Sequence, residues 1–231
     1  MRVVTWNIQQ GGEERASKIA QELKAQAADV VVLTEFRAGS PAITSALHAL
    51  GYVNAHAGTT EPAKNSVLVA ARIALCLLPL EDLPAGCEHR VVGAQAAGVN
   101  IIGMYFPQLE EKIPLFAWLE KQTPVLGRSA TLVIGDLNTG KHRLDENGST
   151  FKAAKEFENL EHLGWTDLWR MHHPDAREYS WYSHSPYKNG FRLDHALGSE
   201  RLASCVTSAD YSHACRERGD SDHSALVLEI R

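Results

Sequence analysis

The chain has 231 residues, of which 44% are hydrophobic and 22% are charged, and its net charge is −5 at neutral pH. This composition is that of an ordinary globular protein and predicts a single domain over residues 1–231. No apolar run approaches the roughly 20 residues that a membrane helix needs, which excludes a membrane-spanning protein. The negative charge argues against a nucleic-acid partner, but it does not decide the matter because binding depends on the local surface.

The N-terminal residues and the cysteines give expectations about the compartment. Residues 1–7, MRVVTWN, enter a strand-like segment at once and show no basic and apolar leader, so we expect a cytoplasmic protein. The four cysteines lack the paired spacing of a zinc site, and we expect them to be reduced thiols.

The first third of the chain alternates strand and helix patterns. Residues 2–6 predict a strand, 13–27 an amphipathic helix, and 29–35 a continuous apolar strand covered on both faces. A second helix is expected at 40–51, with Ser40 as N-cap, Pro41 in the first turn and Gly51 as the stop signal.

The remainder continues the alternation. Further strands are expected at 65–80, 99–107 and 130–136, and helices at 110–122 and 149–165, the last capped by Ser149 or Thr150. Three short strands are predicted around 192–199, 205–211 and 224–230. Because strands and helices alternate without a break in composition, the fold class is α/β.

Polar side chains recur at the ends of these predicted strands, where a sheet forms a rigid platform for function. Each one taken alone is more often a turn residue than a ligand. Together, oxygen donors and one imidazole that converge would favour a hard divalent cation, Mg²⁺ or Mn²⁺, over zinc. The residues concerned are Asn7, Glu35, Asp136, Asn138, Asp194, Asp222 and His223.

Six motifs in chain order resemble the endonuclease/exonuclease/phosphatase superfamily: TWNIQ, VVLTEFR, GMYFPQ, VIGDLNTG, FRLDHAL and SDHSALV. The resemblance implies a four-layer α/β/β/α sandwich with two mostly antiparallel sheets packed face to face. The YFPQ segment around Tyr105 resembles the exonuclease III branch, which contains abasic-site endonucleases.

The resemblance implies Mg²⁺-dependent phosphodiester hydrolysis, with Mn²⁺ as an alternative ion. Glu35 is expected to hold the metal, assisted by Asp222 and Asn7. Asp136 is the expected general base or water-positioning group, and Asn138 would align water or phosphate.

The other three expected catalytic residues act on the phosphate directly or through a neighbour. His223 and Tyr105 would donate hydrogen bonds to phosphate oxygens. Asp194 would fix the tautomer of His223. His195, beside it, should point to the opposite face of the strand and be structural.

The segment 170–192 interleaves cations with aromatic rings, as nucleic-acid surfaces do. Trp181 and Arg192 are therefore expected to contact substrate, with Trp181 partly buried near the site. Arg37, Lys141 and Arg143 are further candidates, although an ordinary exposed basic turn explains 141–143 equally well.

Three functions remain open. The favoured one is a DNA nuclease of DNA repair, monomeric, acting at abasic sites or on 3′ ends. A phosphatase or phosphodiesterase for a small phosphoester is the alternative, because 108–136 and 136–194 are shorter than in typical exonuclease III proteins. An inactive binding module is the third.

Overall fold

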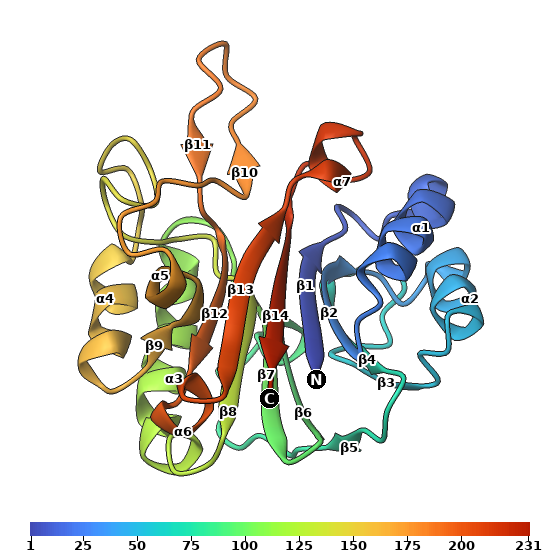
Figure 1. Ribbon diagram of the computed structural model, residues 1–231, viewed down its shortest axis with the longest axis horizontal. Coiled ribbons are helices and arrows are strands. Elements are labelled where there is room, and N and C mark those ends of the chain that lie inside the picture. Colours follow the sequence, from blue (N-terminus) through green and yellow to red (C-terminus); the bar gives the residue numbers. More distant parts are fainter.

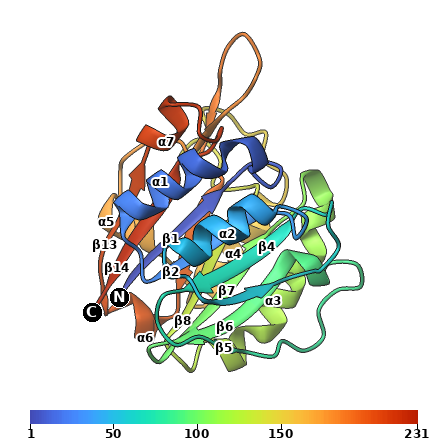
Figure 2. The same ribbon diagram turned by 90° about the vertical axis from the view of Figure 1, so that its right-hand side faces the viewer.

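Two six-stranded sheets lie face to face between outer layers of helices in the computed structural model, which describes residues 1–231 (Figure 1). Helices α1 and α2 cover one outer face, and α3 and α4 cover the other (Figure 1). Figure 2 shows α1 and α2 crossing the first sheet, with the β10–β11 hairpin projecting beyond it. The predicted α/β class and four-layer sandwich are confirmed.

The first sheet has the strand order β13-β14-β1-β2-β4-β3. Only β1 and β2 are parallel in it, and the other neighbours are antiparallel. Its strands are β1 (Arg2–Asn7), β2 (Val30–Phe36), β3 (Asn54–Ala57), β4 (Ser66–Ala71), β13 (Val206–Ser212) and β14 (Ala225–Ile230).

The second sheet has the order β5-β6-β7-β8-β12-β9 and likewise contains one parallel pair, β7 with β8. Its strands are β5 (Cys76–Leu77), β6 (Val91–Ala96), β7 (Val99–Tyr105), β8 (Thr131–Asp136), β9 (Thr166–Asp167) and β12 (Asp194–Gly198). The hairpin strands β10 (Trp181–Tyr182) and β11 (Gly190–Phe191) form a separate ribbon.

The helices differ from the predictions by a few residues at both ends. They are α1 (Ala16–Gln26), α2 (Pro41–Ala49), α3 (Ile113–Leu126), α4 (Ala154–His162), α5 (Leu168–His172), α6 (Glu200–Ala203) and α7 (Ala214–Glu217), with 3₁₀ turns η1 (Glu13–Arg15), η2 (Glu88–Arg90) and η3 (Leu109–Lys112). The prediction that Ser149 or Thr150 caps α4 is wrong, because the Thr150 hydroxyl donates to Glu146 and the helix begins at Ala154. Ser40 precedes α2 but makes no side-chain capping bond.

No helix is both long and apolar enough to span a bilayer.

Three hydrophobic clusters correspond to the three interfaces between layers. Alternate residues of β2 explain the arrangement, since Val30 and Val32 face the second sheet whereas Val31 and Leu33 face α1 and α2. A third cluster joins β7 and β8 to α3 and α4. Strand β2 is therefore covered on both faces, as its unbroken apolar sequence predicts.

The topology brings the polar strand ends to one edge. Parallel strands end on the same side of a sheet, so Asn7 of β1 lies beside the end of β2, and Tyr105 of β7 pairs with Asp136 of β8. Antiparallel β12 begins where β8 ends, and Asp194 is the direct partner of Asp136. Residue His223 precedes β14, which runs antiparallel to β1.

Candidate active site

A pocket of about 430 Å³ opens at this shared edge. Most of the predicted catalytic and metal-binding residues line it, together with one predicted substrate contact. These are Glu35, Tyr105, Asp136, Asn138, Trp181, Asp222 and His223. The pocket walls therefore come from both sheets and from segments that span nearly the whole chain.

Asn7 connects the two sheets at the base of the pocket. Its side-chain amide nitrogen donates to Glu35 Oε1 at 3.2 Å and to Asp136 Oδ2 at 2.9 Å. Its amide oxygen accepts from the Gln9 backbone nitrogen at 2.9 Å. Asn7 thus lies between the two carboxylates and presents its donor groups to them.

Glu35 is aimed at the pocket by an irregularity in β2. The register with β4 shifts between Thr34 and Phe36, and Glu35 itself has a φ of 55°. Such a bulge re-aims a side chain at a strand end. The carboxylate accepts hydrogen bonds from Tyr105 Oη at 3.3 Å and from Asn65 Nδ2 at 3.1 Å.

The hydrogen bonds to Glu35 come from neutral donors. Besides Asn7, Asn65 and Tyr105, the backbone nitrogen of Gln10 donates to it at 2.7 Å. No lysine, arginine or histidine forms an ion pair with Glu35 within 4.0 Å. The half-buried carboxylate is therefore well oriented, but its charge has no cationic partner in the protein.

Tyr105 is poised to act as a hydrogen-bond donor. Burial raises the pKa of its phenol, and the carboxylates of Glu35 and Asp136 raise it further. The phenol consequently keeps its proton at neutral pH. The Arg90 guanidinium lies over the ring, 5.1 Å from its centroid, and supports its orientation.

Asp136 is buried at the end of β8. Gly135 precedes it with a φ of 148°, and a side chain there would collide with the Met104 carbonyl, which explains the glycine in VIGDLN. Burial raises the pKa of Asp136, and the neighbouring Asp194 carboxylate raises it further against the opposing effect of His223. The backbone nitrogen of Asn138 donates to Asp136 Oδ1 at 2.9 Å.

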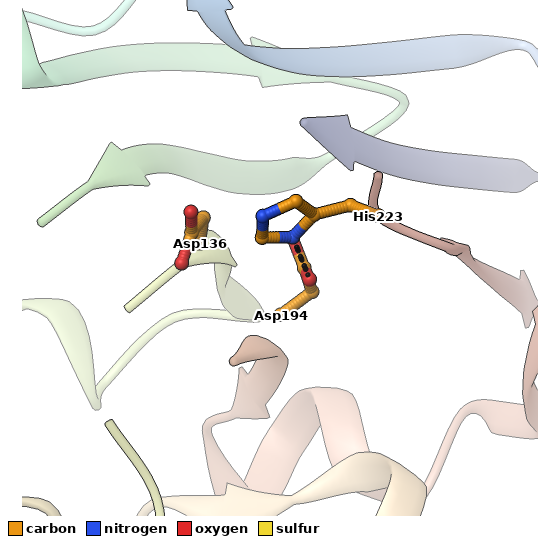
Figure 3. A group of neighbouring side chains, drawn as sticks. All are labelled: Asp136, Asp194 and His223. Carbon is orange, nitrogen blue, oxygen red and sulfur yellow. Dashed lines mark hydrogen bonds and ion pairs between the residues drawn. The ribbon is translucent and has the colours of Figure 1, made fainter. Parts of the chain in front are cut away.

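His223 and Asp194 form a buried pair beside Asp136 (Figure 3). The Nδ1 atom of His223 lies 2.8 Å from Asp194 Oδ2. Burial lowers the pKa of His223, but the charge of Asp194 and its hydrogen bond outweigh burial, so the net shift is upward. One ligand atom from each of Asp136, Asp194 and His223 lies within 4.8 Å of the others.

Asp222 also lines the pocket. Its Oδ2 atom accepts from the Trp181 indole nitrogen at 3.0 Å. Trp181 is half-buried and lines the pocket, which agrees with its predicted position near the site. Its indole also orients the Asp222 carboxylate.

The structure corrects the prediction that Arg192 contacts substrate. Its side chain is fully buried and pairs with Asp145 at 2.7 Å and with Asp167 at 2.5 Å. The same cluster contains His195, whose ring lies on the opposite face of β12 from Asp194 and packs against Phe157. Arg192 therefore joins structural elements behind the pocket.

The other basic candidates lie outside the pocket lining. The Nε atom of Arg37 donates to Asn65 Oδ1 at 2.6 Å, and Lys141 pairs with Glu161 at 2.7 Å. Arg143 is exposed and has a left-handed φ of 63°. The pocket thus contains most of the predicted catalytic and metal-binding residues but none of these three cations.

Two positioning residues were missed from the sequence. Asn65 stands directly before β4 and bonds to Glu35, so the pattern of amides at strand ends could have identified it. Arg15 donates to the carbonyl oxygens of Ile8, Gln9 and Asp220 and so ties together the loops that follow β1 and precede Asp222. Arg15 could not have been identified from the sequence, because all its acceptors are backbone carbonyl oxygens, which every residue carries.

Part of the backbone strain of the protein lies at the pocket. Several non-glycine residues that line it have positive φ angles, a conformation that costs energy and is often retained at functional sites. They are Gln9, Gln10, Glu35, Leu109 and Asn138.

A family model described as endonuclease/exonuclease/phosphatase matches residues 4–223. The chain belongs to the endonuclease/exonuclease/phosphatase family. The resemblance inferred from the six motifs is thereby confirmed, and the match begins within β1, which ends at Asn7, and ends at His223.

This family member is similar to several proteins over their whole length. An exodeoxyribonuclease of Streptococcus pneumoniae is 26% identical over 284 residues, covering 100% of this chain and 99% of the relative. The structure of the 3′ phosphatase NExo from Neisseria, bound to a product DNA hairpin, has a TM-score of 0.85 at 24% identity. An AP endonuclease from Archaeoglobus fulgidus has a TM-score of 0.83 at 22% identity, and both structures cover 100% of this chain and are themselves covered to 99%. These two structures support the fold.

Proposed function

We propose that this chain is a divalent-metal-dependent DNA nuclease that hydrolyses phosphodiesters at abasic sites, at 3′ ends or at both, in DNA repair. The observation that carries the proposal is the convergence of Asn7, Glu35, Asp136 and the Asp194–His223 pair at one pocket. One chain completes the pocket, so we further propose that residues 1–231 act as a single catalytic domain and as a monomer.

The donor set fits a hard divalent ion such as Mg²⁺. Glu35 is half-buried, oriented by neutral donors and without a cationic partner, and Asp222 lines the same pocket. In our proposal Glu35 and Asp222 hold the ion, and Asn7 assists by fixing Glu35 or by turning its amide oxygen inward. A bound ion would polarise a phosphoryl oxygen and reduce the negative charge that an incoming nucleophile meets.

The remaining residues would act on water and phosphate. Asp136, whose raised pKa makes it a stronger base, would accept a proton from the attacking water, and Asn138 would hold that water in line. His223, kept protonated by Asp194, would donate to a non-bridging phosphate oxygen. Tyr105 would donate its phenolic proton in a hydrogen bond to the phosphate or the departing oxygen.

Two features favour DNA over a small phosphoester. The β10–β11 hairpin projects from the molecule (Figure 1), and its strand β10 begins at Trp181, which lines the pocket. The loop between its two strands carries Tyr187, which is 86% exposed. Exposed rings at a rim suit stacking on bases. The names of the similar proteins, an exodeoxyribonuclease and a DNA-bound 3′ phosphatase, point the same way.

A substrate panel tests the proposal. Purified protein would be incubated with an abasic-site duplex, an undamaged duplex, a single strand and a small phosphomonoester, each with Mg²⁺ and with a chelator. We expect cleavage of at least one DNA substrate, abolished by the chelator. Hydrolysis of the small monoester alone would replace the nuclease by the phosphatase alternative.

A further inference from the structure

Lys112 is a buried cation that the proposed chemistry has not used. It ends the η3 turn, seven residues after Tyr105, and its side chain is only 2% exposed. It nevertheless lines the pocket together with Asp136 and Asn138. Its ammonium group donates a hydrogen bond to the backbone carbonyl of Asn138.

The environment of Lys112 leaves part of its hydrogen-bonding capacity unused. An ammonium group has three donors, but the Nζ atom makes one hydrogen bond within the protein. No carboxylate lies within 4.0 Å of it. Burying a lysine without an ionic partner is costly, and such residues are rarely retained for stability alone.

The charge of the pocket indicates what the remaining donors would meet. Glu35, Asp136 and Asp222 bring negative charge to the lining, and a phosphodiester adds another. The other lysine of the lining, Lys152, is exposed and lies 3.8 Å from Glu110. Lys112 is therefore the buried lysine available to an anion in this pocket.

We propose that Lys112 is a further catalytic residue, whose ammonium group contacts a non-bridging oxygen of the scissile phosphate while its bond to Asn138 holds that residue in its turn. The inference rests on the proposed nuclease function. As the water oxygen bonds to phosphorus and the bond to the leaving oxygen breaks, Lys112 stabilises the charge on the phosphate oxygens and transfers no proton.

Other properties of the site agree with this role. Asn138 has a left-handed φ of 50°, a strained conformation that a bond to its carbonyl helps to hold. Burial lowers the pKa of Lys112 to about 8, with Asp136 opposing the shift, so the ammonium form dominates at neutral pH.

The decisive comparison uses Lys112→Met, which removes the charge but keeps the length of the side chain. Under single-turnover conditions at saturating Mg²⁺ and DNA we expect its rate to fall about 10²- to 10³-fold, as when one oxyanion donor is removed. Lys155→Met is the matched control, because Lys155 is an exposed lysine of α4 that does not line this pocket. We expect it to stay within about twofold of wild type, as surface substitutions usually do.

The outcomes are separable. A folded Lys112→Met variant with a normal rate at saturating Mg²⁺, including one that merely needs more Mg²⁺, would overturn the role of Lys112. Failure of the wild-type protein to cleave any DNA would instead refute the proposed function.

A readout on the wild-type protein covers the case in which Lys112→Met does not fold. With ¹⁵N-labelled lysines, the Lys112 ammonium signal is assigned from its absence in Lys112→Arg and should shift when thymidine 5′-monophosphate binds with Mg²⁺. An unmoved signal at saturating nucleotide would reject the contact.

Discussion

His223 and Asp194 form a hydrogen bond of 2.8 Å that joins the two sheets, since Asp194 begins β12 and His223 precedes β14. The bond occupies Nδ1, and the second ring nitrogen makes no hydrogen bond within the protein while the residue lines the pocket (Figure 3). This pair therefore sets both the orientation of the imidazole and its affinity for a proton.

Replacing Asp194 by Asn should shift the pH dependence of activity. The negative charge of Asp194 raises the pKa of His223, and a neutral amide would not. Because our mechanism requires protonated His223, the alkaline limb of kcat/KM should move to lower pH, with a loss on the order of 10²-fold at neutral pH. A pH profile of both proteins measures this, and an alkaline limb at its wild-type position would contradict the assigned role.

Asp136→Asn should abolish turnover without unfolding the protein. The amide cannot accept a proton, so we expect a loss of roughly 10²- to 10⁴-fold. Burial disfavours the charge of Asp136, so its removal should leave the urea midpoint unchanged or raised. Near-normal rates would show that Asp136 has another role.

His223→Ala should also lose turnover while remaining folded, because it removes the proposed hydrogen-bond donor to a phosphate oxygen. Near-normal rates would show that His223 has another role.

Glu35→Gln should raise the Mg²⁺ concentration needed for half-maximal activity. The substitution keeps the shape of the side chain and removes the charge that would hold the ion. Asn65→Ala, which removes a hydrogen bond to Glu35, should shift the titration in the same direction by a smaller factor. A Mg²⁺ titration curve of Glu35→Gln that superimposes on wild type would exclude Glu35 as a ligand.

Arg192→Met should destabilise the fold rather than weaken substrate binding. It would leave Asp145 and Asp167 buried without their partner, which typically costs about 3–5 kcal/mol. The free energy of unfolding in urea gives the cost, and the KM for DNA of the remaining folded protein should be unchanged. Normal stability combined with weaker DNA binding would restore Arg192 to the substrate contacts.

The buried His195 should make the fold sensitive to acid. Burial and Arg192 lower the pKa of His195 to about 4, whereas an unfolded histidine titrates near 6.5. Its stabilising contribution is therefore present above pH 6.5 and is lost as pH falls toward 4, by up to roughly 3 kcal/mol. Comparing urea unfolding at pH 7 and pH 5 should reveal a smaller pH effect in His195→Asn. Equal pH effects in the two proteins would assign the acid sensitivity to other groups.

The sequence alone was enough to predict that polar residues gather at the strand ends. Local patterns located β2 and β8 closely, because an apolar run followed by a carboxylate is a signal carried by adjacent residues. The order of the six motifs indicated the family, and with it the sandwich. Helix starts were less predictable, since Thr150 bonds to Glu146 in place of capping α4.

Tertiary structure decided which charged residues belong to the pocket. Arg192 and Lys112 are both cations in polar stretches of sequence, yet the fold places Arg192 between two buried carboxylates and Lys112 at the pocket wall. The partners of a charge come from distant segments, such as Asp145 for Arg192 or the Asn138 carbonyl for Lys112. A side chain's neighbours through space, which set its solvation and charge, are not encoded in its neighbours along the chain.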